Sequence, residues 1–332
     1  MAMFNDRRGA IKKLKLLTYN PKSSVDSFRA KLEEEFRTVF LPNKVELTEY
    51  KYGNIMCDVL SPEIYSSNRI LIYVHGGCFT GGSRASWRSF CSSIANKTYS
   101  RVVVPEYRLA PSYPYPAAIE DIQSVFRAVF TEEQIACSLN SEDGKAKLPE
   151  IIIGADGSGA SIALSLVFNL REKYRSCIKN VILFSPWLDV SPNSRLLTAK
   201  KACDEVMSAE VIRKSCGDYT YGANTASPSV SPLLADVELL EQFPPVFIQM
   251  GEKEILLEDA VAFQKKLVEA GNQCVLDVWP DMMYMFQMAD EYISQSHLAL
   301  DKIGKIVTGN TCGEKALEFI NKPVLEHGLS VD

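Results

Sequence analysis

The feature that most constrains the fold of this chain is a repeated alternation between short apolar runs and stretches with a helical period. The apolar runs have the length of strands and are bounded by Gly, Pro or polar residues. They span residues 70–74, 102–104, 151–153, 181–184, 246–250 and 274–279. Because parallel strands are joined by crossover helices and are buried on both faces, this alternation predicts an α/β protein with a mostly parallel sheet and helices on both faces.

The segments outside these runs predict how the domain is completed. Residues 25–40 are charged and helical in period, and residues 45–50 and 54–60 alternate as strands do, which brings the sheet to about eight strands. Residues 189–232 lack strand patterning and are expected to form helices. The predicted organisation is an N-terminal helical cap segment (1–44), a core (45–188 and 229–306), an inserted helical cap or lid (189–228) and a C-terminal extension (307–332).

Composition narrows the possible functions. A net charge of −5, with 46% hydrophobic and 23% charged residues and no basic stripe, argues against nucleic-acid binding. No apolar run is long enough for a membrane span or a signal peptide. The nine cysteines are irregularly spaced, with no C-x-x-C pair, which is typical of reduced thiols rather than of a disulfide framework or a zinc site. We therefore expect a cytoplasmic protein without a metal or a cofactor.

Function is expected where the strands end, because ligands of such sheets bind outside the carboxyl ends of the strands. His75, Gly76 and Gly77 directly follow the run at residues 70–74. Small residues at this place let a loop approach a substrate, so that backbone N–H groups point at a developing oxyanion. The sequence therefore predicts an oxyanion loop after this strand.

Four segments, in order, resemble the hormone-sensitive-lipase-like family of carboxylesterases. V-H-G-G-C-F at 74–79 is similar to the H-G-G-G loop of the family, with Cys78 in place of the last glycine. E-Y-R-L-A-P at 106–111 is similar to its D-Y-R-L-A-P stretch. S-P-W-L-D at 185–189 and S-P-L at 231–233 match two further signatures.

The resemblance covers roughly residues 45–305 and has consequences for fold and site. It implies the α/β-hydrolase fold, carboxylic ester hydrolysis and a helical cap. It also implies oxyanion donors at the backbone N–H groups of Gly76, Gly77 and Ser158. A homodimer is compatible with the resemblance.

The nucleophile position departs from the pattern of the family. The segment G-A-D-G-S-G-A at 154–160 is similar to G-D-S-A-G-G when Asp156 is placed on the aspartate of the family, and Gly157 then falls on the nucleophilic serine. Two alternatives stay open. A slip of one residue would make Ser158 the nucleophile, but it would be flanked by Asp156, where the turn favours a small residue. Asp156 could itself imitate an aspartate nucleophile, which would still require a histidine.

The acid position keeps a carboxylate, whereas the base position has a tyrosine in place of the histidine of the family. G-E-K-E-I-L at 251–256 is similar to G-E-x-D-x-L and places Glu254 at the acid position, where either carboxylate can orient an imidazole. P-D-M-M-Y-M-F at 280–286 is similar to P-G-M-x-H-x-F and places Tyr284 at the general base. A phenol with a pKa near 10 is a poor proton acceptor at neutral pH.

No other residue is an obvious replacement for the lost groups. His75 belongs to the oxyanion loop, His297 lies along the following helix, and His327 lies in the C-terminal extension. Each is expected to be structural or solvated rather than a base. Cys78 is a possible substitute nucleophile, but it has no histidine assigned to activate it, and a free cysteine is usually a small buried hydrophobic residue.

Loss of both nucleophile and base determines the expected function. Removing either residue from a serine hydrolase costs about six orders of magnitude in turnover. The sequence therefore predicts a pseudoenzyme that binds a small acyl or carboxylate ligand. Two alternatives are an active carboxylesterase or lipase with a triad relocated to Ser158 or Asp156, and an interaction protein whose pocket is closed by Tyr284, Met283 and Met285.

Overall fold

The strands of the chain form one sheet in a computed structural model that describes residues 5–37, 41, 44–139, 148–191, 194–197 and 204–309. The spatial order of the sheet is β1-β2-β4-β3-β5-β6-β7-β8. The strands are β1 Val45–Tyr52, β2 Ile55–Pro62, β3 Arg69–Val74, β4 Arg101–Pro105, β5 Glu150–Asp156, β6 Ile178–Phe184, β7 Val246–Gly251 and β8 Cys274–Trp279. β2 is antiparallel to β1 and β4, whereas all pairs from β4 to β8 are parallel. The predicted α/β fold with a mostly parallel sheet is confirmed.

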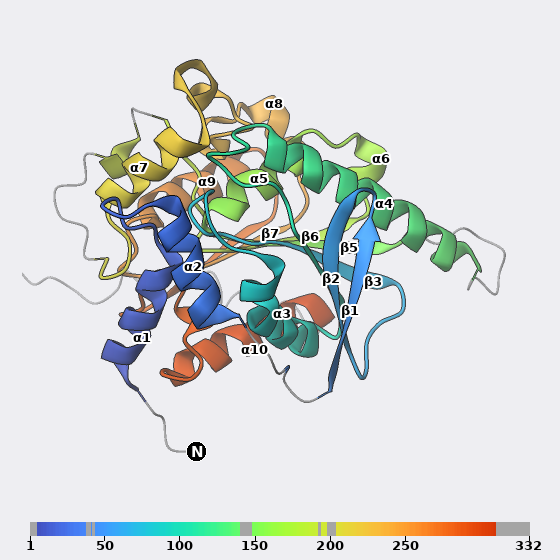
Figure 1. Cartoon of the computed structure of the whole chain (residues 1–332). Coiled ribbons are helices and arrows are strands. Elements are labelled where there is room, and N and C mark those ends of the chain that lie inside the picture. The colour runs from blue at the N-terminus through green and yellow to red at the C-terminus, as the bar shows by residue number, and fades with distance from the viewer. Residues whose placement is uncertain are drawn as a thin grey trace, which may run out of the picture.

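Helices cover both faces of this sheet (Figure 1). α3 packs against α10 on one face, and α4 packs against α5 on the other. The helices are α1 Arg7–Leu14, α2 Val25–Phe36, α3 Arg84–Thr98, α4 Ala117–Leu139, α5 Gly157–Phe168, α6 Glu172–Arg175, α7 Ala209–Tyr219, α8 Val237–Leu240, α9 Leu257–Glu269 and α10 Ser294–Thr308. The described residues also form the 3-10 turns η1 Lys15–Leu17, η2 Arg195–Leu197, η3 Gly222–Ala226, η4 Pro232–Leu234 and η5 Phe286–Met288.

The burial of each element explains how its apolar residues are distributed along the sequence. The central strands β3, β5 and β7 are buried along nearly their whole length, as continuous apolar runs of parallel strands require. Every residue of α5 is buried, which is why this helix is apolar on all sides and not only on one stripe. β1 lies at an edge of the sheet and is mostly exposed, so its sequence alternates between apolar and polar residues.

Helices from two distant parts of the sequence lie at one end of the molecule. α1 and α2 come from the N-terminal segment and α7 from the insertion, and all three lie on the left in Figure 1. Arg29 of α2 attaches this group to the core, because its guanidinium donates to the carbonyl oxygens of Thr80 (2.7 Å) and Ala110 (3.0 Å). Residues 192–193 and 198–203 of the predicted insertion, and most of the predicted C-terminal extension, lie outside the described residues.

None of the helices in the described ranges combines the length and the apolar character needed to cross a bilayer.

Candidate active site

Gly157, which the sequence assigns to the nucleophile position, occupies the turn from β5 into α5. Its φ of +46° lies in the left-handed region, which favours glycine, and its carbonyl oxygen accepts a hydrogen bond from the Trp187 N–H at 2.9 Å. A β-carbon added to Gly157 would overlap the hydroxyl oxygen of Tyr284. The absent side chain therefore leaves the space that the Tyr284 hydroxyl fills.

Tyr284 lies in the loop after β8, at the position that the sequence assigns to the general base. Only 1% of its surface is exposed. Burial, together with the charge of Asp156, raises the pKa of the Tyr284 phenol well above its usual value. The phenol is therefore neutral and cannot accept a proton at neutral pH. The two residues that the sequence assigns to the nucleophile and base positions are thus neighbours and fit each other sterically.

Asp156 holds the oxyanion loop in place by hydrogen bonds. Its Oδ1 accepts hydrogen bonds from the Tyr73 hydroxyl (2.9 Å), the Gly76 N–H (3.0 Å) and Trp87 Nε1 (2.8 Å). Burial raises the pKa of the Asp156 carboxyl to about 7, although these donors lower it. A carboxyl held by three donors on one oxygen ties β3, α3 and the oxyanion loop together, which gives Asp156 a structural use that does not involve attack on a substrate.

Ser158 also faces the oxyanion loop. Its side chain is fully buried, and its Oγ accepts a hydrogen bond from the Phe79 N–H at 2.9 Å. Ser158 is the second residue of α5, where the backbone N–H groups of the first turn have no partner within the helix. The Ser158 N–H thus remains a candidate oxyanion donor, while its hydroxyl holds the loop.

The oxyanion loop itself has one donor fewer than the sequence suggests. The N–H of Gly76 is used by Asp156, so it does not face a substrate in this conformation. Gly77 has a φ of +103°, and a β-carbon there would overlap the carbonyl group of Gly81, so only glycine fits. The backbone N–H groups of Gly77 and Ser158 are the sequence-predicted donors that this geometry leaves for an oxyanion.

Glu254 is the residue that the sequence assigns to the acid position. It lies just after β7 and is 5% exposed, and its Oε1 accepts hydrogen bonds from the Gly251 N–H (2.5 Å) and the Ser185 hydroxyl (2.9 Å). Its Oε2 is buried and has no hydrogen-bond partner in the part of the chain that the structure describes. Burial raises the pKa of Glu254 well above its usual range. One oxygen of this carboxyl therefore has no donor among the described residues.

Neither of the two described histidines, His75 and His297, supplies a catalytic imidazole. His75 is buried between the rings of Trp87 and Tyr107, at 5.0 and 4.4 Å between ring centroids, and burial lowers its pKa to about 4. Its Nδ1 lies 2.8 Å from the carbonyl oxygen of Gly76. His297 is exposed on α10. His327 lies outside the described residues, so its place remains a prediction from sequence.

Cys78 is buried and unreactive in its surroundings. Its Sγ points at the carbonyl oxygen of Leu17, 3.8 Å away, and burial raises the pKa of the thiol to about 11. The thiolate is the nucleophilic form of cysteine, so a thiol with this pKa is a weak nucleophile near neutral pH.

Aromatic side chains pack around the oxyanion loop. Phe79, in the oxyanion loop, stacks on Tyr219 at the end of α7, with ring centroids 4.0 Å apart and planes 10° apart. Phe79 also contacts Trp187 at 5.3 Å between centroids. These three residues are at most 2% exposed, and Met283 and Met285 are fully buried as well.

Sequence reasoning missed two features of this site. The hydroxyl of Ser185 donates to Glu254 and accepts from the Met285 N–H at 3.1 Å, so it joins the acid position to the loop of Tyr284. Ser185 was visible in the S-P-W-L-D signature, but the signature gives it no role. The stack of Phe79 on Tyr219 joins residues 140 positions apart, and no local pattern in the sequence signals it.

Comparisons with known proteins give a consistent picture. Residues 71–288 match a family described by the alpha/beta hydrolase fold. An esterase of Acinetobacter venetianus is 31% identical over 73% of this chain and 76% of its own length. An acetyl-hydrolase of Streptomyces hygroscopicus is 26% identical over 71% of this chain and 74% of its own length. A solved esterase of the bacterial hormone-sensitive lipase family, 25% identical, has a TM-score of 0.78 and covers 90% of this chain and 96% of its own.

Proposed function

This chain belongs to the α/β-hydrolase-fold family, in its hormone-sensitive-lipase-like branch, and we propose that it is a catalytically impaired member that does not turn over esters. The observation that carries the proposal is the fit of Tyr284 to Gly157. A serine at residue 157 would collide with the Tyr284 hydroxyl, so the packing around Tyr284 requires glycine at the nucleophile position.

The magnitude of the loss supports this proposal. Removing the nucleophile or the base of a serine hydrolase lowers turnover by about 10⁶-fold and leaves about 10³- to 10⁴-fold over water. Here both groups are replaced, and the Gly76 N–H is used by Asp156. The remaining rate would be too low for a metabolic catalyst.

A relocated triad has little support from the geometry. The hydroxyl of Ser158 is fully buried and accepts from the Phe79 N–H, and the carboxyl of Asp156 holds three donors. His75 is enclosed by aromatic rings and His297 is exposed on α10. Within the described residues, no histidine forms a hydrogen bond to either candidate nucleophile, which argues against this alternative.

A small acyl or carboxylate ligand would have to displace side chains before it could bind beside Gly157. The Tyr284 hydroxyl occupies the space next to Gly157, and Phe79, whose N–H donates to the neighbouring Ser158, stacks on Tyr219. This arrangement favours a closed pocket, and hence an interaction or structural role, over a resident small ligand. A shift in the unfolding temperature with millimolar butyrate would instead favour the ligand-binding form of the proposal.

The test is an assay with a short-chain p-nitrophenyl ester. We expect no turnover above background from the unmodified chain, and a gain of at least about 10²-fold from the double variant Gly157→Ser, Tyr284→His. In that variant, the carboxyl of Glu254, which interacts electrostatically with residue 284, is expected to orient the imidazole. The matched control Gly157→Ala, Tyr284→His restores the base without a nucleophile and should stay inactive. Turnover by the unmodified chain at ordinary esterase rates would overturn the proposal.

A further inference from the structure

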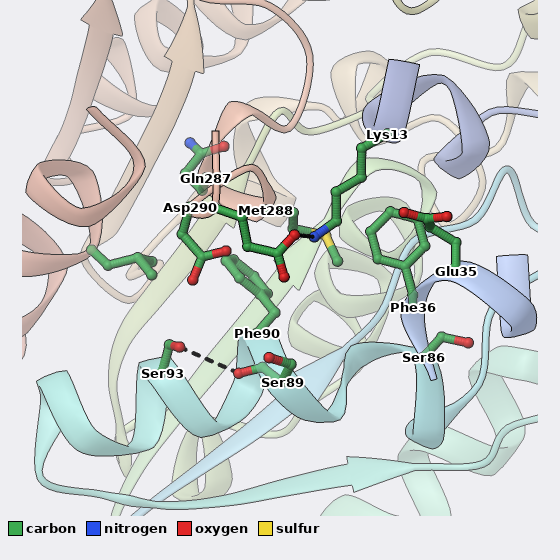
Figure 2. A pocket seen from close by; sticks show the side chains of 12 residues that line it. Lys13, Glu35, Phe36, Ser86, Ser89, Phe90, Ser93, Gln287, Met288 and Asp290 are labelled. Atoms are coloured by element: carbon green, nitrogen blue, oxygen red, sulfur yellow. Dashed lines mark hydrogen bonds and ion pairs between the residues drawn. The ribbon is translucent and has the colours of Figure 1, made fainter. Parts of the chain in front are cut away.

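The N-terminal helix α1 contacts both ends of residues 281–291, which we call the base segment because it carries the residue at the base position. At one end, Arg7 Nη1 donates to the carbonyl oxygen (2.6 Å) and to the Oδ2 (3.2 Å) of Asp281. At the other end, Lys13 Nζ lies 3.0 Å from the carboxylate of Glu291. Figure 2 shows the side chain of Lys13 pointing from α1 toward this end of the base segment.

Backbone contacts also join α1 to the residues that follow the base segment. The N–H of Asp6 donates to the carbonyl oxygen of Tyr292 at 2.8 Å, and Asn5 forms a β-bridge with Ile293. The apolar face of α1 is buried as well. The helix is therefore packed on the domain, and its ion pairs to the base segment start from a fixed position.

Arg7 connects the base segment to a second part of the molecule, the segment that precedes α7. Its Nε lies 3.1 Å from the Oε2 of Glu205, and its Nη2 donates to the same oxygen. The side chain of Arg7 is 26% exposed, so solvent screens these charges only in part. One guanidinium thus joins α1, the segment before α7 and the base segment.

Asp281 departs from the family pattern in a way that these contacts explain. The similar motif P-G-M-x-H-x-F has glycine at this position, and the φ of Asp281 is +61°, in the left-handed region that favours glycine. The carboxylate of Asp281 pairs with both Lys253 and Arg7, and its N–H donates to Glu252 Oε2 at 2.9 Å. The hydrogen bond from Lys253 and the charge of Arg7 lower the pKa of this carboxyl. An unfavourable backbone conformation is thus combined with a carboxylate that binds α1.

We propose that α1 acts as a strap that keeps the site beside Gly157 closed. The Tyr284 hydroxyl fills the space next to Gly157 from within the base segment, and α1 holds both ends of this segment. Release of the Arg7 contacts frees the end nearer to Tyr284, and it frees the segment before α7 at the same time. Access to Gly157 therefore depends on the N-terminal helix, whether or not the chain hydrolyses esters.

The test is hydrogen–deuterium exchange of the full chain, measured by mass spectrometry in peptides that cover residues 280–288. In Arg7→Ala, we expect exchange in these peptides to be at least about threefold faster than in the unmodified chain, because local opening no longer breaks the Arg7 contacts. Peptides from β3 and β5 should exchange as before. The matched control is Arg8→Ala. Arg8 is exposed and forms no ion pair within the described part of the chain, so its removal should leave exchange in residues 280–288 unchanged.

Two further measurements assign the effect to the strap. Asp281→Asn removes the charge but tolerates the left-handed conformation, and it should also speed exchange in residues 280–288. The double variant with Arg7→Ala should be no more than about twofold faster than the faster single variant, because both changes break the same contact. Sodium chloride at about 1 M should speed exchange more in the unmodified chain than in Arg7→Ala, since it screens the ion pairs.

Two results would contradict the proposal. Unchanged exchange of residues 280–288 in Arg7→Ala would show that α1 does not hold the base segment. Equal acceleration in the peptides from β3 and β5 would show that Arg7 stabilises the whole fold and not the closed site.

Discussion

The steric fit between residue 157 and Tyr284 can be measured as a coupling energy. A β-carbon at residue 157 would overlap the Tyr284 hydroxyl, but the next nearest tyrosine atom, Cζ, would lie at 3.4 Å, an ordinary contact. Gly157→Ala should therefore be destabilising for two reasons. The left-handed φ of +46° costs about 1–2 kcal/mol, and the overlap costs about 1–3 kcal/mol. Tyr284→Phe removes only the hydroxyl, so it should cancel the second cost and leave the first.

The assay is a double-mutant cycle from urea denaturation of the four chains. We expect Gly157→Ala to be about 1–3 kcal/mol less destabilising in the Tyr284→Phe background than in the unmodified chain. Gly271→Ala is a matched control, because Gly271 has a φ of +81° and an added β-carbon there would meet nothing within 4 Å. Its cost should be the same in both backgrounds. A coupling between residues 157 and 284 below about 0.5 kcal/mol would refute the steric argument.

Two further predictions concern the buried carboxyl groups. Because burial raises the pKa of Asp156 to about 7, the folded chain keeps this proton between about pH 4 and 7 while the unfolded chain releases it, so this contribution to stability falls as pH rises through that range. The side chain of Asp156→Asn cannot ionise, so its free energy of unfolding does not lose this contribution. Measured by urea denaturation, the stability of Asp156→Asn relative to the unmodified chain should increase by about 3 kcal/mol between about pH 5 and 8. A relative decrease over this range would contradict the assignment. Ser185→Ala removes the donor to Glu254 and should cost about 1–3 kcal/mol in the same assay, whereas Ser176→Ala, at an exposed hydroxyl, should cost under about 0.5 kcal/mol. Equal effects of the two serine variants would show that the bond to Glu254 does not stabilise the fold.

Most of the fold was predictable from the sequence, because parallel strands that are buried on both faces consist of continuous apolar runs. The six apolar runs correspond to β3 through β8, and the two alternating segments correspond to β1 and β2. The positions of Gly157, Glu254 and Tyr284 were also readable, because each directly follows a strand or its turn. The sequence identifies these residues but does not show how their side chains are oriented.

What the sequence could not show depends on contacts between distant residues. The use of the Gly76 N–H by Asp156 follows from the pairing of β3 with β5, which sets the two loops side by side. The fit of the Tyr284 hydroxyl into the space beside Gly157 depends on the path of a loop 127 positions further along the chain. Local patterns in the sequence hold no information on such contacts, so only the structure shows that residues 157 and 284 lie next to each other.

The central claim is that this chain has no working nucleophile, and covalent labelling tests it most directly. The unmodified full chain would be incubated with excess fluorophosphonate and its intact mass measured, with an active serine esterase treated in parallel as a positive control. The account predicts that the mass of this chain stays unchanged while the control gains one adduct. A stoichiometric adduct on this chain, located at Ser158 by peptide mapping, would contradict the account and establish a relocated triad.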